Sequence, residues 1–225
     1  GEEEANYGYL AVVNSIDIQH AIAVDMGGGS TEIALINNRT KVNSVSFPFG
    51  ALTLTKQFFK HAIPSGKELQ QLREYLHRQF STQPWLKEQS LPLVAIGGTA
   101  RNLAKIHQRK NNYPLSSVHT YTMGKNDLLE IFEWLAPLPV ESRKKVDGLS
   151  RDRADIIHIG LFLFYTLMDW LKSDQLMFSG KGLRDGILFE RLMKEKARPY
   201  LDDVAMYSTE QFMNRYQVNK KHAYH

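Results

Sequence analysis

Two short apolar runs in the sequence each end at a cluster of glycines. Ala21–Met26 is followed by Gly27–Gly29. Leu91–Ile96 is followed by Gly97-Gly98. Continuous apolar runs of this length are typical of strands that are buried on both faces. The pattern therefore predicts two central strands, each with a tight glycine turn at its carboxyl end.

The residues after the first glycine cluster alternate between apolar and polar side chains. This alternation runs over Ser30–Ile36 and Val42–Phe49, on either side of Asn37-Asn38, and indicates a β-hairpin. Together with the buried strand before it, the hairpin gives three consecutive strands at the start of the fold. Ahead of them, Glu3–Ser15 has the character of an amphipathic helix.

The rest of the chain alternates between helical and strand patterns. Thr99 follows a buried strand and is expected to cap the helix that begins there. The expected helices are Leu52–His61, Lys67–Phe80, Arg101–Arg109, Lys125–Leu135, Val140–Val146, Ser150–Trp170 and Gly182–Glu195, and the further strands are His119–Met123 and Gln175–Ser179.

This order of elements is that of a ribonuclease-H-like α/β domain, the unit of the actin, Hsp70 and sugar kinase superfamily. The expected architecture is a mixed five-stranded sheet flanked by helices, with ligands at the carboxyl ends of its strands. After Arg198-Pro199 the composition turns polar, and Tyr207–His225 has the pattern of a further helix. We therefore expect one domain over residues 1–198, and a linker with a short helical tail over residues 199–225.

Charge is distributed unevenly along the 225 residues. Residues 1–38 hold six of the 24 acidic side chains and none of the 28 basic ones, which leaves 28 basic against 18 acidic side chains in the remainder. An acidic segment beside a basic remainder suits a site for metal and phosphate with a polyanionic substrate. The same asymmetry is compatible with a solvated surface of no special function. No recognised nucleic-acid-binding motif accompanies the basic balance.

The composition also bears on the compartment. Cysteine is absent, which excludes disulfides and thiolate metal sites and fits a reducing compartment such as the cytoplasm. The longest apolar stretch, Ile156–Leu171, is interrupted by His158 and Asp169. It is also shorter than the roughly 20 residues that cross a bilayer. We therefore expect a buried core helix there and no membrane partner.

The segment Asp25–Glu32 (DMGGGSTE) joins two expected strands and is the sharpest candidate site. Its glycines can adopt positive φ and bring backbone N–H groups close to an anion, and its hydroxyls add donors. Asp25 can hold Mg²⁺ or orient a water, and Glu32 can reach the same cavity. The alternative is a glycine-rich hairpin with only a conformational role. The candidate phosphate ligands are Gly27, Gly28, Gly29, Ser30 and Thr31, and the candidate metal ligands are Asp25 and Glu32.

A second glycine turn, in Ile96–Arg101 (IGGTAR), joins a strand to a helix. The exposed N–H groups and the dipole at the start of that helix favour an anion, and Arg101 adds positive charge. Such turns are common in α/β proteins, so it is the pairing with the first glycine loop that indicates an anion site. The candidate ligands here are Gly97, Gly98, Thr99 and Arg101.

Three glutamates, Glu2, Glu3 and Glu4, stand at the start of the first expected helix. Carboxylates interact favourably with a helix N-terminus, so a surface helix start is the ordinary interpretation. Attack of water on phosphorus needs a nearby base to orient the water. The cluster offers carboxylates for that role, although the residue pattern alone does not choose between the two interpretations.

Taken in order, these motifs resemble the exopolyphosphatase and guanosine pentaphosphate phosphohydrolase (Ppx/GppA) family. The resemblance covers about Gly1–Leu192 and includes later segments besides the two glycine loops. The segments that carry it are GEEEA at 1–5, DMGGGSTE at 25–32, AIGGTARNLA at 95–104, Gly148-Leu149 with Arg153-Ala154-Asp155, and GLRDG at 182–186.

The resemblance implies a phosphohydrolase that releases the terminal phosphate of inorganic polyphosphate or the γ-phosphate of pppGpp, with Mg²⁺ as cofactor. It gives Glu4 the role of the water-activating base, and Asp25 and Glu32 the roles of catalytic, metal-binding carboxylates. The two glycine loops match the phosphate loops of the family. Arg184, in the GLRDG segment, is expected to be structural rather than catalytic.

The resemblance also implies more architecture than this sequence holds. Family members begin with a domain of similar fold that carries its own phosphate loop, and the substrate crevice lies between the two domains. We therefore expect this chain to form one wall of the cleft and to be inactive by itself. Longer members continue into a helical domain of HD type, whose first histidine His222 would match, although no His-Asp pair is present. Members often dimerise, so a homodimer is a further expectation.

Two other functions stay open from the sequence. One is an ATP-dependent kinase of the same superfamily, for which Gly180 and Gly182 are a weak match to adenosine-pocket glycines. The other is a catalytically silent phosphate-binding or interaction module. The choice between polyphosphate and pppGpp is open as well, because both present a terminal phosphoanhydride to the same loops.

Overall fold

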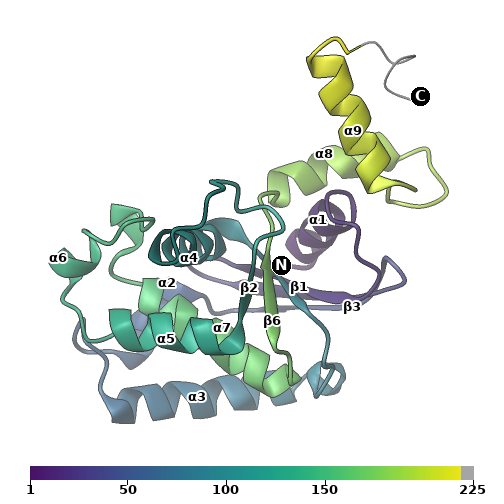
Figure 1. The fold of residues 1–225 in the computed structure, drawn as a ribbon. Coiled ribbons are helices and arrows are strands. Elements are labelled where there is room, and N and C mark those ends of the chain that lie inside the picture. The colour runs from purple at the N-terminus through teal and green to yellow at the C-terminus, as the bar shows by residue number, and fades with distance from the viewer. Residues whose placement is uncertain (219–225) are drawn as a thin grey trace.

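The computed structural model describes residues 1–218. Its centre is a mixed sheet of six strands in the order β3-β2-β1-β4-β6-β5, with helices packed on both faces (Figure 1). The strands are β1 (Ala21–Met26), β2 (Thr31–Asn37), β3 (Thr40–Phe47), β4 (Leu93–Ile96), β5 (Thr122–Gly124) and β6 (Gln175–Phe178). The helices are α1 (Glu2–Val13), α2 (Ala51–Phe58), α3 (Gly66–Ser81), α4 (Gly97–Lys110), α5 (Lys125–Leu135), α6 (Val140–Arg143), α7 (Ile157–Leu171), α8 (Leu183–Met193) and α9 (Val204–Arg215), with single 3-10 turns η1 (Pro84–Leu86) and η2 (Arg151–Arg153).

Strand β1 organises the sheet because it pairs in both senses. It runs antiparallel to β2, with Asp25 opposite Glu32, and parallel to β4, with Asp25 opposite Ile96. Parallel neighbours end at the same edge of a sheet, so the glycine loops after β1 and β4 emerge side by side. The expected hairpin between β2 and β3 is present, and its turn residues Asn38 and Arg39 have positive φ.

The alternation of side chains along β1 divides the core into two layers. Ile22, Val24 and Met26 face a large cluster that includes residues of α2, α3, α4, α5 and α7. Ala21 and Ala23 face a smaller cluster formed with α1, α8 and the segment leading to α9. Every residue of β1 is buried, which explains why its sequence is a continuous apolar run rather than an alternating one.

Two elements differ from the sequence-based expectation. The sheet has six strands rather than five, because every expected strand joins it, including the one expected at His119–Met123, which is the short antiparallel edge strand β5 beside β6. The helix expected over 150–170 is divided into η2 and α7. The reason for the division is a hydrogen bond at Ala154, whose carbonyl accepts from the buried guanidinium of Arg143 at 3.2 Å.

The start of α4 also differs from its expectation. The helix begins directly at Gly97, with Ile96 in the N-cap position, so Thr99 lies inside the first turn. Gly97 has a φ of 93°, which turns the strand into the helix without a capping side chain. The prediction of Thr99 as the N-cap is therefore wrong.

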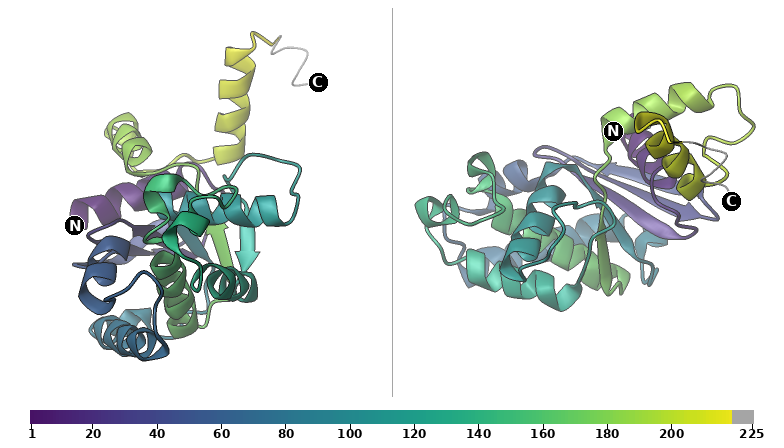
Figure 2. Two further views of the ribbon diagram at one scale, coloured as in Figure 1. Left: turned by 90° about the vertical axis from the view of Figure 1, so that its left-hand side faces the viewer. Right: turned by 45° about the horizontal axis from the view of Figure 1, so that its top comes forward.

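The last helix of the described residues is α9, which projects from the body of the domain beyond α8 (Figures 1 and 2). Val204, at its first turn, is buried in the smaller core cluster. His222, the candidate for an HD-type histidine, lies outside the described residues. Within residues 1–218, no helix is both long and apolar enough to span a membrane.

Helix α1, which carries Glu4, is held in place by a close approach to α8. A Cβ atom at Gly186 would lie 2.0 Å from the carbonyl oxygen of Tyr7. Such contact of one helix backbone with another requires the glycine. The position of Glu4 therefore depends on a residue far away in the sequence.

We predict that Gly186→Ala destabilises the fold by about 2–3 kcal/mol, because the added methyl group forces α1 and α8 apart. The matched control is Gly66→Ala at the start of α3, where a Cβ meets no atom within 4 Å. Alanine there is expected to be neutral or slightly stabilising. Urea unfolding of the two variants measures the difference, and equal stabilities would contradict the predicted helix contact.

Candidate active site

A cavity of ≈ 460 Å³ opens where the carboxyl ends of β1 and β4 meet. It is formed by both glycine loops, by the 3-10 turn η2 and by the start of α8. Its lining residues are Asp25, Met26, Gly27, Gly28, Ile96, Gly97, Gly98, Arg101, Arg153, Gly182, Leu183, Arg184 and Asp185. The structure therefore brings the two predicted phosphate loops to one cavity, where residues from η2 and the start of α8 join them.

The two loops are fitted to each other at Gly97 and Asp25. A Cβ at Gly97 would lie 2.6 Å from Oδ1 of Asp25, and the positive φ of Gly97 disfavours any side chain there. The absence of a side chain lets the carboxylate of Asp25 lie against the first turn of α4. The glycine is thus required both by the turn and by the close approach.

The first glycine loop is seated on the start of α2. The carbonyl of Gly27 accepts from the N–H of Ala51, and the carbonyl of Gly28 accepts from the N–H groups of Leu52 and Thr53. A Cβ at Gly50 would lie 2.4 Å from the Gly27 carbonyl oxygen, so this seat requires glycine as well. These contacts fix the loop and leave its N–H side free to face an anion.

The loop donors are not equivalent. The N–H of Gly27 closes a turn on the carbonyl of Ser30 at 3.0 Å, so it is already used. For the N–H groups of Gly28 and Gly29, no hydrogen-bond partner is found in residues 1–218. Thr31 is fully buried, and its hydroxyl donates to the carbonyl of Phe49 at 2.7 Å. The hydroxyl of Thr31 thus makes an internal hydrogen bond, whereas the N–H groups of Gly28 and Gly29 can donate to a phosphate.

Asp25 and Glu32 form a buried pair of carboxyl groups on adjacent strands. They lie opposite each other in the β1–β2 ladder, with 7% and 5% of their surface exposed. Oε1 of Glu32 accepts from the hydroxyl of Ser46 at 2.7 Å. Burial, with a further contribution from the charge of Glu32, raises the pKa of Asp25 to about 6. An incoming cation would remove this repulsion.

This pair fits the requirements of Mg²⁺. The ion is commonly held by one or two carboxylates, with waters and substrate phosphates as its other ligands. No group of three or more aspartate, glutamate or histidine side chains is placed to bind one ion within residues 1–218. A divalent cation here would accordingly depend on the substrate phosphate for part of its coordination.

Glu4 lies near this pair but outside the cavity lining. It stands in the first turn of α1, 49% of its side chain is exposed, and its Oε2 lies 3.1 Å from the amino nitrogen of Gly1. Its charge contributes to the raised pKa of Asp25, which places it within electrostatic reach of the carboxyl pair. Glu4 therefore has a solvated carboxylate at the open side of the site.

Three arginines line the cavity, Arg101, Arg153 and Arg184, and the first two interact with the glycine turn or the carboxyl pair. Arg101, in the first turns of α4, is one of the predicted ligands and lowers the pKa of Asp25 against the larger effect of burial. Arg153 lies against the backbone of Gly98, and its Nη1 donates to the hydroxyl of Thr99 at 3.3 Å. Thr99 is thus occupied in positioning Arg153. The residue pattern indicated Arg153 only as part of a family signature, with no role of its own.

A second helix N-terminus also faces the cavity. The first turn of α8 is closed by a bond from the N–H of Gly182 to Oδ2 of Asp185 at 3.0 Å, and both residues line the cavity. Arg184, expected to be structural, is exposed at the rim. With α4 and α8, two helix dipoles point their positive ends toward the same space. The arrangement is suited to a multiply charged anion.

Comparison with known proteins places this geometry in a family. A model of the Ppx/GppA phosphatase family matches residues 1–195. Exopolyphosphatase 2 of Mycobacterium tuberculosis is 28% identical over 197 residues, which cover 83% of this chain and 61% of that protein. A guanosine-5'-triphosphate,3'-diphosphate pyrophosphatase of Pseudoalteromonas translucida is 24% identical over 99% of this chain and 43% of its own length.

A solved structure agrees with these matches. The Ppx/GppA family member of Aquifex aeolicus superposes with a TM-score of 0.79 at 30% identity, over 88% of this chain and 64% of that one. The likeness confirms the ribonuclease-H-like fold. The chain spans less than two thirds of the length of each of these relatives. Since the family model covers most of its residues, the chain belongs to the Ppx/GppA phosphatase family.

Proposed function

We propose that this chain provides the catalytic and phosphate-binding wall of a phosphoanhydride hydrolase, which releases the terminal phosphate of inorganic polyphosphate or the γ-phosphate of pppGpp. The observation that carries the proposal is the single cavity in which both glycine loops, three arginines and the buried Asp25 meet. The relatives named exopolyphosphatase and guanosine pyrophosphatase support this choice of substrates. No observation favours the kinase alternative.

The terminal phosphate binds between the N–H groups of Gly28 and Gly29 and the first turn of α4. Arg101 and Arg153 balance the charge of its oxygens, which is the main requirement of phosphoryl transfer. Asp25 and Glu32 would hold Mg²⁺, and the ion would supply positive charge toward the oxygens of the transferred group. The contributions of Ser30, Thr31 and Thr99 to phosphate binding stay predictions. The hydroxyl of Thr31 already donates to the carbonyl of Phe49, whereas that of Thr99 accepts from Arg153 and keeps its own proton to donate.

Glu4 serves as the general base. Its exposed carboxylate accepts the proton of a water that attacks phosphorus from the open side of the cavity. The carboxylates of Asp25 and Glu32 add negative charge close to Glu4. Because this charge repels a polyanionic substrate, a bound cation is needed to hold the substrate there. Exposure of Glu4 is compatible with this role when a facing domain encloses the water.

We further propose a second domain that faces this cavity and completes the cleft. The greater length of the matching relatives supports it. In this arrangement residues 1–198 form one domain, and residues 199–225 connect it to a helical region. The chain by itself would then bind phosphate but turn substrate over poorly. Cytoplasmic location and a homodimeric assembly remain proposals that rest on the family alone.

We predict that Glu4→Gln lowers kcat at least about 100-fold when the facing domain is present, because general-base catalysis contributes on that scale. Affinity for polyphosphate should change little, since the side chain lies outside the cavity lining. Phosphate release and substrate binding are measured in parallel. Glu3→Gln, on the same helical turn, is the matched control. Full turnover by Glu4→Gln would remove Glu4 from the role of base.

We predict that Asp25→Asn abolishes activity but stabilises the fold above about pH 6 in the presence of EDTA. Because the pKa of Asp25 is raised from 3.8 to about 6, ionisation of this side chain costs stability as the pH rises through that range. The gain is at most about 3 kcal/mol at pH 8 and vanishes near pH 4. Thermal unfolding against pH tests this. The exposed Asp17→Asn should keep the pH profile of the unmodified chain, and an equal profile for Asp25→Asn would contradict the prediction.

A further inference from the structure

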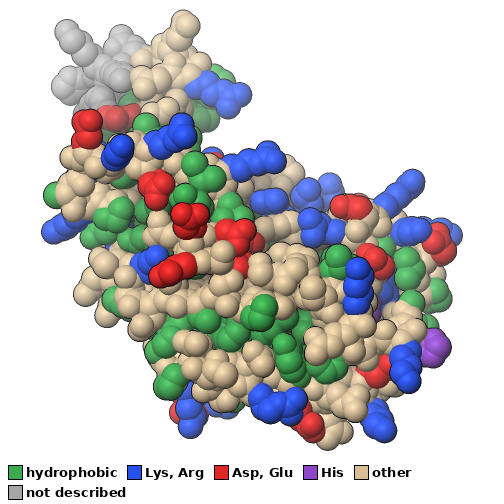
Figure 3. Space-filling view, turned by 180° about the vertical axis from the view of Figure 1, so that it is seen from behind, with side chains coloured by type: hydrophobic (Ala, Val, Ile, Leu, Met, Phe, Trp, Pro, Cys, Tyr) green, Lys and Arg blue, Asp and Glu red, His purple; other side chains and the backbone are tan. Residues whose placement is uncertain are grey.

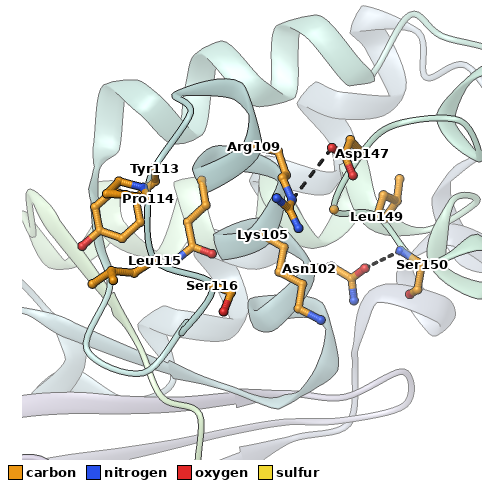
Figure 4. Close-up of a pocket in the computed structure, with 12 residues that line it drawn as sticks. Asn102, Lys105, Arg109, Tyr113, Pro114, Leu115, Ser116, Asp147, Leu149 and Ser150 are labelled. Carbon is orange, nitrogen blue, oxygen red and sulfur yellow. Dashed lines mark hydrogen bonds and ion pairs between the residues drawn. The ribbon is translucent and has the colours of Figure 1, made fainter.

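A second and larger cavity, of ≈ 540 Å³, lies farther along α4 (Figure 4). Asn102, Lys105 and Arg109 rise from the helix into it, between a loop that carries Tyr113–Ser116 and a loop that carries Asp147–Ser150. Its lining is more polar than apolar and contains two basic side chains. The proposed catalytic mechanism does not use this cavity.

The two cavities lie in sequence along one face of α4. Arg101 lines the first cavity, and Lys105 and Arg109 line the second. Residues spaced by four share a helix face, so the three side chains form a basic stripe. At 1.5 Å per residue the stripe extends about 12 Å along the helix axis, beginning at the phosphate site.

Asn102 forms the wall between the cavities. Its Nδ2 donates to the carbonyl of Gly98 at 2.8 Å, and its Oδ1 accepts from the N–H of Ser150 at 2.6 Å. Gly98 belongs to the first cavity and Ser150 to the second. A Cβ at Gly148 would lie 2.7 Å from backbone atoms of α4, so the outer loop rests directly on the helix. The spacing of the two cavities is therefore fixed by the backbone.

The second cavity has positive charge that is only partly neutralised. Lys105 is exposed, and its side chain makes no ion pair or hydrogen bond with any of residues 1–218. Arg109 is paired with Asp147 at 3.8 Å, but both side chains are largely exposed, 63% and 82%. Lys and Arg side chains are numerous on the part of the surface away from α9 in Figure 3, with some acidic side chains among them. An exposed pair of this kind is weak and can exchange for a stronger anion.

We propose that this cavity binds the downstream phosphates of a linear polyphosphate whose terminal phosphate occupies the first cavity. The inference rests on the proposed function and extends it to a specificity for long chains. Lys105 and Arg109 are the binding residues, and Asp147 opposes the ligand. A short substrate that ends within the first cavity gains nothing from the second.

The test measures binding by calorimetry to the 225-residue chain, with long-chain polyphosphate and with tripolyphosphate as separate probes. Lys105→Gln/Arg109→Gln is expected to weaken binding of the long chain about tenfold, because each lost charge contact contributes a few-fold. Binding of tripolyphosphate should stay within about twofold. The matched control is Lys67→Gln/Arg78→Gln on α3, which removes the same charge from exposed sites far from both cavities.

A variant that removes a negative charge from the second cavity gives a second test. Asp147→Asn frees Arg109 and removes a repulsive charge, so it should strengthen binding of the long chain a few-fold and leave tripolyphosphate unchanged. Equal effects of Lys105→Gln/Arg109→Gln on both probes, or none on either, would overturn the second site while leaving the first intact. With pppGpp titrated as a third probe, a loss of binding confined to pppGpp would overturn it in favour of a nucleotide subsite. Failure of the unmodified chain to bind any of the three probes would reject the proposed function as well.

Discussion

The parallel pairing of β1 with β4 is the constraint on which the rest of the site depends. It sets Asp25 opposite Ile96 and brings the next residue, Gly97, against the aspartate carboxylate. Only a residue without a side chain allows that approach. From it follow the position of the first turn of α4, the direction in which its N–H groups point, and the place of Arg101. The first glycine loop meets the same point because β1 leads directly into it.

This arrangement places an acidic group where burial opposes its charge. Asp25 is almost fully enclosed beside Glu32, and its pKa is raised accordingly. Arg101 and the N-termini of two helices supply positive potential nearby, but not enough to restore the ordinary pKa. A site that is destabilised when empty and relieved by a cation and an anion together is a common compromise between stability and function. Here the cost in stability arises at one side chain, that of Asp25.

Local sequence signals were sufficient for the features that depend on local chemistry. An apolar run followed by glycines specified both β1 and β4 with their loops, and these are the walls of the cavity. Local signals do not reach the contacts that distant residues make. The hydroxyl of Thr31 donates to the carbonyl of Phe49, and the hydroxyl of Thr99 accepts from Arg153, and neither partner lies near in the sequence. Arg153 itself comes from a 3-10 turn, and the buried Arg143 donates to the carbonyl of the residue that follows it, a contact that no local pattern reveals.

Helix α4 connects the hydrophobic core with the two cavities, because one of its faces packs in the core and the other carries the basic stripe. Leu103, Ala104 and Ile106 are buried in the larger core cluster and fix the helix against α7. The basic stripe lies on the remaining face, where side chains are half-buried or exposed. Charges on that face can therefore change without disturbing the packing that positions the second glycine turn. The catalytic geometry is determined by the inner face, whereas the length of anion that the helix can bind is determined by the outer one.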